Sequence, residues 1–340
     1  MGSARAAAQT STRPAHRTRV RSHNSRFPPH GTFVAAGVPD TQSFPFPLID
    51  VHTHLMPERL FRAVRAYFRA HLWHPRYDAP AEELVQTLLD AGVSRFVFMP
   101  YAHRGDMSRS LNHWVANVQS TFAPHGIGFG TFHPDDDALI PELVTEAFVK
   151  LGLAGAKLHP QVGNFALDDP RLDPVYRGAI EHGRVLLIHA GRRPEDGERS
   201  EGSQRSERGG GSQRIERSEH LGARAFGRLM RRFPSLRVIV AHAGADEFNA
   251  FFDLCGTYQG VYLDTAMVFN NFLGGPPPID RLLEFQDRVL FGSDFPNIPY
   301  SYATALEAIL DLRLGRALET KLLSTNAARL LGLDIHSEPR

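Results

Sequence analysis

Two histidines, His52 and His54, lie one residue apart at the end of a short apolar segment, in the stretch LIDVHTHLMP (48–57). Residues i and i+2 of an extended chain project from the same face, so both imidazoles are expected to point the same way. Imidazole nitrogens are common ligands of divalent transition metals. Because the chain contains 17 histidines, one such pair is expected by chance, and a metal site needs support from the rest of the sequence.

Polar side chains that could join a metal site also end several later apolar segments. Lys157 and His159 stand in GAKLHP, His189 in LLIHAG, His242 in IVAHAG and Asp294 in LFGSDFP. Taken singly, such a histidine is more often a boundary residue, and Asp294 could instead form a turn or cap a helix. Their joint occurrence predicts a shared site if these segments all end at one edge of the fold.

The segments that carry these residues alternate with amphipathic stretches. Short β-rich apolar runs occur at 47–52, 95–99, 126–132, 154–158, 184–189, 236–241, 260–264 and 288–292. Runs this continuous are typical of strands buried on both faces, as in parallel sheets. Three intervening stretches, 81–92, 140–152 and 173–183, have helical spacing and end at glycine, and 302–331 predicts two or three further helices.

Eight strand–helix units favour an α/β fold of the (β/α)8 type, a distorted TIM barrel with extra C-terminal helices. No G-x-G-x-x-G follows the first strand, which disfavours an open dinucleotide-binding sheet. In a TIM barrel the carboxyl ends of all strands meet at one mouth. The polar residues that end the apolar runs are therefore expected to converge there.

Two segments fall outside this pattern. Residues 1–45 are rich in arginine, have no Asp or Glu before Asp40 and show no hydrophobic periodicity; we expect a disordered basic tail, with a transit peptide as the alternative. Residues 192–220 contain one aliphatic side chain, Ile215, and the near-repeat GSQRSER and GSQRIER. Such a segment buries too little apolar surface to fold, so we expect a disordered insertion after the fifth strand. The barrel domain is predicted over 46–335.

Composition narrows the functional classes. The formal net charge of +1 gives no general reason to expect nucleic acid or membrane binding, and no apolar run approaches the length of a membrane span. Cys255 is the single cysteine, which excludes an internal disulfide framework and a cysteine-based zinc site. We expect a cytoplasmic protein that acts on a small molecule. The sequence leaves open whether it forms a homo-oligomer.

The ordered set of motifs resembles a known superfamily. D-x-H-x-H at 50–54, single histidines at 189 and 242, and Asp294 resemble the amidohydrolase superfamily. The series KLHP, DDP, PVY, IHAG, AHAG and GSDFP is more specifically similar to its amidohydrolase-related branch, over about residues 47–333. The resemblance implies a metal-dependent enzyme. That branch contains hydrolases of amides, esters and lactones, and non-oxidative decarboxylases of aromatic and muconate-type acids.

The resemblance also implies a ligand set for the metal. His52, His54, His189 and Asp294 would hold one divalent ion, with Zn²⁺ expected and Mn²⁺ or Fe²⁺ as alternatives. Asp294 would also accept the proton of a metal-activated water and pass it to the leaving group. His242 would polarise the scissile carbonyl or shuttle protons. We therefore predict Asp294 and His242 as the catalytic residues.

Lys157 leaves the number of metal ions open. In binuclear members of the superfamily a carboxylated lysine on the fourth strand bridges two metals, and His242 and His159 would then be further ligands. Otherwise Lys157 would bind a substrate carboxylate or pair with an acidic neighbour. We favour one ion and predict a substrate-binding set that consists of Lys157, His159, Tyr101 and Arg192.

Three functions follow from these observations. The main prediction is a mononuclear hydrolase in which a metal-activated water attacks an amide, ester or lactone carbonyl. The alternative is a decarboxylase of an aromatic or unsaturated acid, in which Asp294 and His242 manage protonation at carbon. A barrel that serves only as a binding module is disfavoured, because such a module has no need of an open metal position.

Overall fold

The computed structural model describes residues 44–191, 221–270 and 275–335. Almost all of the predicted tail (1–45) and the whole predicted insertion (192–220) lie outside the described residues, as does Arg192. The disorder of both segments and the domain limits at 46 and 335 therefore stay predictions.

Within the described residues, eight parallel strands form one sheet in chain order. They are β1 (Leu48–Thr53), β2 (Val93–Phe98), β3 (Gly126–Thr131), β4 (Gly155–Leu158), β5 (Val185–Ile188), β6 (Arg237–Val240), β7 (Val261–Asp264) and β8 (Val289–Leu290). Each of these strands lies within two residues of a predicted apolar run, so all eight strand predictions are confirmed.

The last strand returns to the first and closes the sheet. The backbone N–H of Asp294 donates to the carbonyl oxygen of His52 (2.9 Å), and that of His54 donates to the carbonyl oxygen of Phe295 (2.7 Å). A parallel bridge also joins Thr53 to Phe295. We call these contacts between the end of β1 and the residues after β8 the barrel seam. Closure at the seam confirms the predicted TIM barrel.

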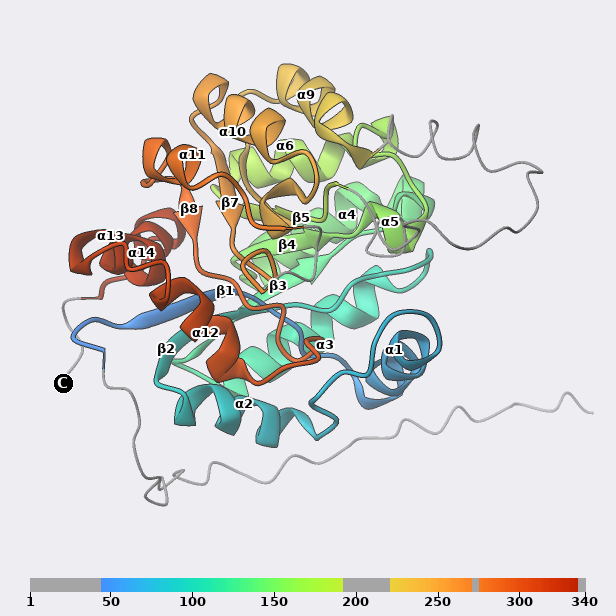
Figure 1. The fold of residues 1–340 in the computed structure, drawn as a ribbon. Coiled ribbons are helices and arrows are strands. Elements are labelled where there is room, and N and C mark those ends of the chain that lie inside the picture. The colour runs from blue at the N-terminus through green and yellow to red at the C-terminus, as the bar shows by residue number, and fades with distance from the viewer. Residues whose placement is uncertain (1–43, 192–220, 271–274, 336–340) are drawn as a thin grey trace, which may run out of the picture. The chain divides into compact units, whose positions relative to one another are not determined.

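Helices lie around the outside of the strands (Figure 1). They are α1 (Glu58–His71), α2 (Ala81–Asp90), α3 (Ser108–Thr121), α4 (Ile140–Thr145), α5 (Pro160–Gly163), α6 (Asp173–Glu181), α9 (Ala223–Arg232), α10 (Phe248–Thr257), α11 (Ile279–Glu284), α12 (Tyr302–Leu310), α13 (Arg316–Thr320) and α14 (Asn326–Leu331). Short 3-10 segments cover Pro134–Leu139, Pro170–Leu172 and Ala241–Gly244, and π-helical turns cover Glu146–Lys150 and Lys321–Thr325. The predicted helices within 81–92, 140–152, 173–183 and 302–331 are all present.

Alternate residues along the strands pack into two separate buried clusters. Ile49, Leu187 and Ile239 belong to the cluster in the barrel interior. Leu186 and Val238, one residue away on the same strands, belong to the cluster shared with the surrounding helices. This alternation is expected where both faces of a parallel sheet are covered. Each fully buried aliphatic side chain contributes roughly 1.5–3 kcal/mol, so the barrel forms a rigid frame for the residues at its strand ends.

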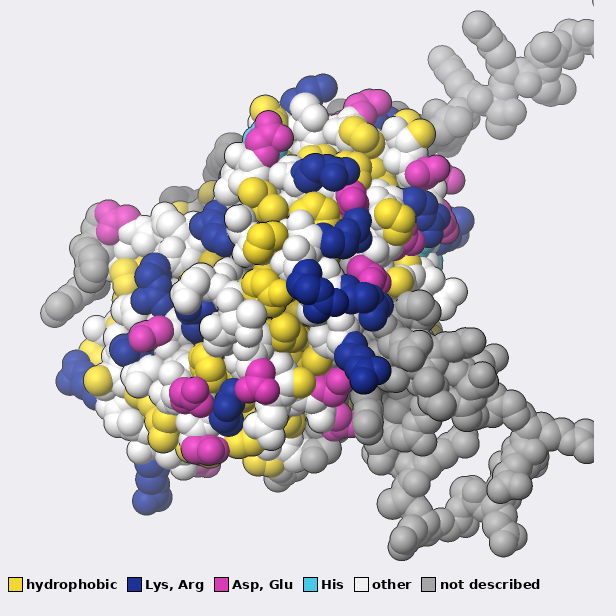
Figure 2. Space-filling model, turned by 90° about the horizontal axis from the view of Figure 1, so that it is seen from above, with side chains coloured by type: hydrophobic (Ala, Val, Ile, Leu, Met, Phe, Trp, Pro, Cys, Tyr) yellow, Lys and Arg dark blue, Asp and Glu magenta, His cyan; other side chains and the backbone are white. Residues whose placement is uncertain are grey.

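Part of the outer surface is of mixed character. On the face seen in Figure 2, Lys and Arg side chains lie among Asp and Glu side chains and small hydrophobic areas. No helix among the described residues is both long enough and apolar enough to cross a membrane.

Candidate metal centre and active-site cavity

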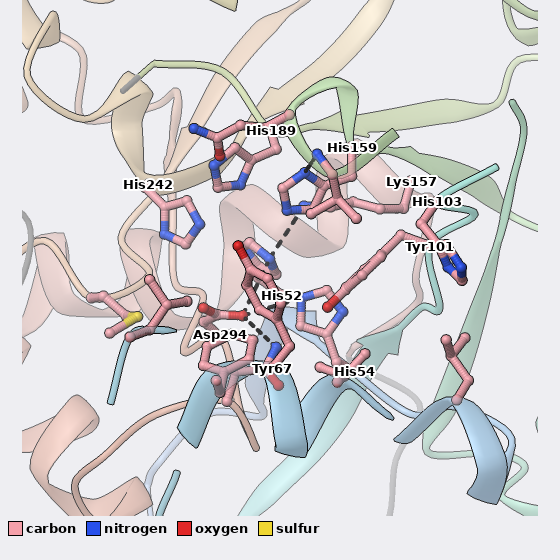
Figure 3. A pocket seen from close by; sticks show the side chains of 18 of the residues that line it. His52, His54, Tyr67, Tyr101, His103, Lys157, His159, His189, His242 and Asp294 are labelled. Carbon is pink, nitrogen blue, oxygen red and sulfur yellow. Dashed lines mark hydrogen bonds and ion pairs between the residues drawn. The ribbon is translucent and has the colours of Figure 1, made fainter. Parts of the chain in front are cut away.

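A cavity of about 420 Å³ lies at the carboxyl ends of the strands. Its lining includes every predicted site residue that the structure describes, namely His52, His54, Tyr101, Lys157, His159, His189, His242 and Asp294 (Figure 3). These residues come from β1, β4 and the segments that follow β1, β2, β4, β5, β6 and β8. The barrel therefore brings together the side chains whose convergence the sequence predicts.

Asp294 lies between the two histidines of the D-x-H-x-H motif. Its Oδ1 is 3.1 Å from His54 Nε2 and 3.8 Å from His52 Nε2. Asp294 has a left-handed backbone conformation with φ of 64°, which is uncommon for residues other than glycine, although Asp adopts it more readily than most. One ligand atom from each of the three residues lies within 4.8 Å of the other two, so this group could hold a metal ion.

Asp264, at the end of β7, orients the His52 ring through the ring nitrogen that does not face Asp294. Its Oδ2 accepts a 2.9 Å hydrogen bond from His52 Nδ1, and its Oδ1 accepts from the backbone N–H groups of His242 (2.8 Å) and Ala266 (3.0 Å). Because the carboxylate accepts at Nδ1, the neutral His52 ring carries its proton there and leaves Nε2 with a free lone pair. This arrangement is typical of the carboxylate–histidine pairs that support metal ligands.

Two further rings are fixed in the same tautomer by backbone carbonyls. His54 Nδ1 donates to the carbonyl oxygen of Met99 (3.0 Å), and His242 Nδ1 donates to that of Ala266 (3.0 Å). A carbonyl oxygen can only accept, so Nδ1 is the protonated nitrogen in both rings. In the neutral rings each Nε2 therefore carries a lone pair that can bind a metal or take up a proton. The 3.1 Å contact of His54 Nε2 with Asp294 Oδ1 is a hydrogen bond only when Nε2 is protonated as well.

Burial sets the charge states of the cavity. It lowers the pKa of His52, His159 and His189 well below the usual histidine range, and the nearby Lys157 amine adds to the effect at His52. Burial raises the pKa of Asp294, but the hydrogen bond from His54 and the neighbouring imidazoles outweigh it and hold this pKa well below its usual range. Neutral imidazoles and an ionised carboxylate are the forms that coordinate a divalent ion, so these residues fit a metal.

His189, the fourth predicted ligand, is not brought into the group of His52, His54 and Asp294. Its ring stacks on that of His159 at 4.1 Å and an interplanar angle of 13°, and it lies 4.9 Å from the ring of His242. His189 therefore faces the other three predicted ligands from across the cavity (Figure 3). Its coordination of a metal stays a prediction.

Lys157 contributes a buried amine to the floor of the cavity. Its Nζ lies 3.4 Å from His52 Nε2. Burial lowers the pKa of Lys157 to about 8, against the opposing pull of Asp264 and Asp294. An amine with this pKa is readily converted between its charged and neutral forms near neutral pH, so it can bind an anionic substrate group without fixing a permanent charge beside the imidazoles.

Helix α1 supplies an apolar wall to the cavity, and the sequence predictions do not single it out. Leu60, Ala63, Val64, Tyr67 and Phe68 line the cavity from this helix. Their spacing of three and four residues places them on one face of α1. In Figure 1, α1 and α5 both lie at the end of the barrel toward which β1 points.

Asp264 and Asn297 are two of the polar residues of this site that the sequence analysis missed; His103 and Gln161 also line the cavity. Asp264 ends the seventh predicted run just as Asp294 follows the eighth. Its place at the end of an apolar run could therefore have identified Asp264 as a site residue. Asn297 lines the cavity, and its Nδ2 donates to Asp294 Oδ1 (3.3 Å). Nothing in its sequence context distinguishes Asn297 from loop residues that have no role in a site.

A parallel eight-stranded barrel with histidines and an aspartate at its carboxyl mouth is the architecture of the metal-dependent amidohydrolase superfamily. The chain belongs to the Amidohydrolase family, whose model matches residues 49–333. The match covers nearly all of the barrel and confirms the resemblance inferred from the motifs.

Individual relatives are more distant. The 2-amino-3-carboxymuconate-6-semialdehyde decarboxylase of Dictyostelium discoideum is 23% identical over 341 residues, which cover 84% of this chain and 92% of the relative. The solved structure of 5-carboxyvanillate decarboxylase from Sphingomonas paucimobilis matches with a TM-score of 0.58 and 19% identity, over 85% of this chain and 100% of that one. The 5-carboxyvanillate decarboxylase of Novosphingobium aromaticivorans, in complex with manganese and 4-hydroxy-3-methoxy-5-nitrobenzoic acid, matches with a TM-score of 0.59 and 15% identity, over 88% and 100%.

These comparisons contradict the main functional prediction. The relatives are decarboxylases, so the prediction of a hydrolase with a metal-activated water is wrong, and the stated alternative fits better. The physical reason is that both reactions need the same donors at the barrel mouth. The same imidazoles and carboxylate can hold a metal that binds either water or the oxygens of an acid. The motifs therefore indicate the superfamily and not the reaction.

Proposed function

We propose that this protein is a metal-dependent, non-oxidative decarboxylase of an aromatic or unsaturated carboxylic acid. The observation that carries the proposal is the composition of the cavity. It combines the group formed by His52, His54 and Asp294 with a buried amine, Lys157, under an apolar wall from α1. Such a cavity can hold the polar end of an acid at its floor and a flat apolar body above it. The decarboxylase relatives support the same reaction.

The proposed metal site holds one divalent ion through His52, His54 and Asp294, with His189 as the fourth ligand. A bound ion would act as a Lewis acid that fixes the acid in the cavity and stabilises the negative charge that develops on the substrate skeleton when carbon dioxide leaves. The nitrogen and oxygen donors suit Zn²⁺ and Mn²⁺. Manganese is the ion in the related Novosphingobium structure, and the sequence alone favours Zn²⁺.

The remaining polar residues hold and orient the acid. Lys157 pairs with an anionic oxygen at the cavity floor. The ring of Tyr101 lies edge-on to His54, with centroids 5.5 Å apart, and 5.0 Å from the ring of His159. These rings form a side wall against which an unsaturated substrate can stack. Arg192, also predicted to bind substrate, lies outside the described residues.

Loss of carbon dioxide requires a proton at carbon. When the bond between the carboxylate and the substrate skeleton breaks, its electron pair stays on the skeleton carbon, which then takes one proton. Asp294 and His242 both line the cavity, and the free Nε2 of His242 can take up a proton from solvent. We assign delivery of this proton to Asp294 and His242, and no external oxidant or reductant is needed for the reaction to balance.

A substrate panel tests the reaction. Metal-loaded protein is incubated with hydroxybenzoic acids, carboxyvanillate-type acids and carboxymuconate semialdehydes, and in parallel with esters, lactones and amides. We expect carbon dioxide from at least one acid. In D2O the product should carry one deuterium at the carbon that lost the carboxylate. Hydrolysis of an ester, lactone or amide, with no carbon dioxide from any acid, would overturn the proposal.

Variants link the activity to the proposed ligands. His54→Ala is expected to lose both the bound ion, measured by elemental analysis, and the release of carbon dioxide. His113→Ala is the matched control, because His113 lies on α3 with its side chain 51% exposed and pairs with Glu146 at the surface. Retention of the ion and of activity in His54→Ala would exclude this ligand set.

A further inference from the structure

Arg65 of α1 is buried without enough hydrogen-bond partners. It is 1% exposed, and its Nε and Nη2 groups have no hydrogen-bond partner among the described residues. Its Nη1 donates to Asn297 Oδ1 (3.0 Å), and its guanidinium lies 4.4 Å from the centroid of the Phe61 ring. Arg65 does not line the cavity, but Asn297 does.

This burial is costly for stability. A buried charge with unpaired donors destabilises the folded state, and an apolar side chain of similar volume in its place is often neutral or stabilising. The contact with the Phe61 ring offsets only part of that cost. The stability of the fold therefore does not account for an arginine at this position.

The single hydrogen bond of Arg65 determines how Asn297 is oriented. A guanidinium can only donate, so it fixes the amide oxygen of Asn297 toward Arg65 and the amide nitrogen away from it. That nitrogen, Nδ2, donates to Asp294 Oδ1 (3.3 Å), and the backbone N–H of Asn297 donates to the carbonyl oxygen of Asp294 (2.9 Å). With the amide reversed, an oxygen would face the carboxylate and repel it.

We propose that Arg65 is a positioning residue that acts through Asn297 to hold the Asp294 carboxylate toward His54. The proposal rests on the metal ligands assigned under the proposed function. In this arrangement Arg65 contacts neither substrate nor metal. Its buried charge polarises the Asn297 amide, which strengthens the hydrogen bond that amide donates to Asp294. Asp294 Oδ1 is thereby kept at the place where it faces the two imidazoles.

Metal affinity, measured by calorimetric titration of Mn²⁺ and Zn²⁺ into metal-stripped protein, tests this role without reference to activity. Arg65→Met is expected to bind the ion roughly 10-fold more weakly or worse, the usual effect of losing a supporting hydrogen bond behind a ligand. Arg65→Lys, which can still donate to Asn297, should recover most of the affinity. Arg62→Met is the matched control, because Arg62 lies on the same helix with its side chain 70% exposed.

Thermal unfolding of the same metal-free proteins separates positioning from structure. Arg65→Met should unfold at the same temperature as the parent protein or higher, because an unsatisfied buried charge has been removed. Asn297→Ser removes the connection to Asp294 but keeps the arginine, and it should weaken metal binding to a similar extent. In the Asn297→Ser background, Arg65→Met should have little further effect on metal affinity.

The outcomes are distinct. Unchanged metal affinity, within twofold, in either Arg65→Met or Asn297→Ser would overturn the positioning role, and so would additive losses in the double variant. If Arg65→Met does not fold, Asn297→Ser and Arg65→Lys decide the question. A parent protein that binds neither ion would instead refute the metal site of the proposed function.

Discussion

The backbone N–H of Asp294 donates a 2.9 Å hydrogen bond to the carbonyl oxygen of His52. The same two residues face each other through their side chains, with Asp294 Oδ1 3.8 Å from His52 Nε2. One pair therefore both closes the barrel and contributes two of the candidate metal ligands. The separation of these ligands is set by main-chain hydrogen bonds, which makes the site sensitive to any change that moves the end of β8.

Gly292 is expected to be essential to this spacing. A Cβ at this position would lie 2.8 Å from His52 Cβ and 3.2 Å from Asp264 Cβ, so Gly292→Ala must displace the end of β8. We predict a loss of about 1–3 kcal/mol in the free energy of unfolding, as for other overpacked cores, and at least a 10-fold loss of metal affinity. The control is Gly256→Ala in α10, where the nearest atom, Phe285 Cζ, is 3.4 Å away; it should bind metal normally.

Asp264→Asn tests whether the carboxylate sets the tautomer of His52. The variant keeps the size of the side chain, and its oxygen can still accept from the His242 and Ala266 backbone. Its amide nitrogen would then face His52 Nδ1 and donate to it, which moves the ring proton to Nε2 and blocks coordination. We expect metal affinity to fall 10- to 100-fold. Asp253→Asn, at a side chain that is 71% exposed, should have no effect; equal affinity in both variants would contradict the orienting role.

The wall formed by α1 is expected to select apolar acids. Val64 lines the cavity, whereas Ala66, two residues later on the same helix, is exposed. Val64→Asp places a negative charge beside the bound acid and removes an apolar contact, so kcat/KM for an aromatic acid should fall 10-fold or more, mainly through KM. Ala66→Asp introduces the same charge on the outer face of the helix and should leave kcat and KM unchanged. An equal effect of the two variants would show that α1 does not contact the substrate.

Cys255 is expected to make stability depend on pH in the alkaline range. Burial raises its pKa from 9.0 to about 12, so the folded state keeps the thiol proton at pH values where the unfolded chain loses it. Stability from this group is therefore constant below pH 9 and decreases as the pH rises from about 9 to 12. The unfolding free energy of the parent protein, relative to Cys255→Ala, should be about 1.4 kcal/mol lower at pH 10 than at pH 8. A difference that does not change with pH would show that the thiol ionises equally in both states.

The strands were predictable because each is a continuous apolar run between breaks. Even β8, which has only two residues, lies within a recognisable run at 288–292. The convergence of His52, His189 and Asp294 on one mouth followed from the parallel topology. Distances between side chains did not follow, because the stacking of His189 on His159 depends on the rotation of both rings.

Other parts of the site carry no local signal. Arg65 belongs to a helix rich in exposed arginines, and only tertiary packing places it in the interior. Asp264 follows a strand as many structural aspartates do, and its role appears only when His52, far away in sequence, is placed beside it. The reaction itself could not be predicted, because the donors that bind the metal are shared by hydrolases and decarboxylases.

Because of the barrel seam, metal binding requires a completely folded barrel. Asp50 and Ser293, which are hydrogen bonded across it, are 243 residues apart in sequence, so the proposed metal site cannot exist until nearly the whole barrel has been arranged. An ion that binds only the closed barrel stabilises it in proportion to the logarithm of its free concentration. The metal would then hold the ends of the first and last strands together, and a chain whose barrel is open at this position would not bind the ion.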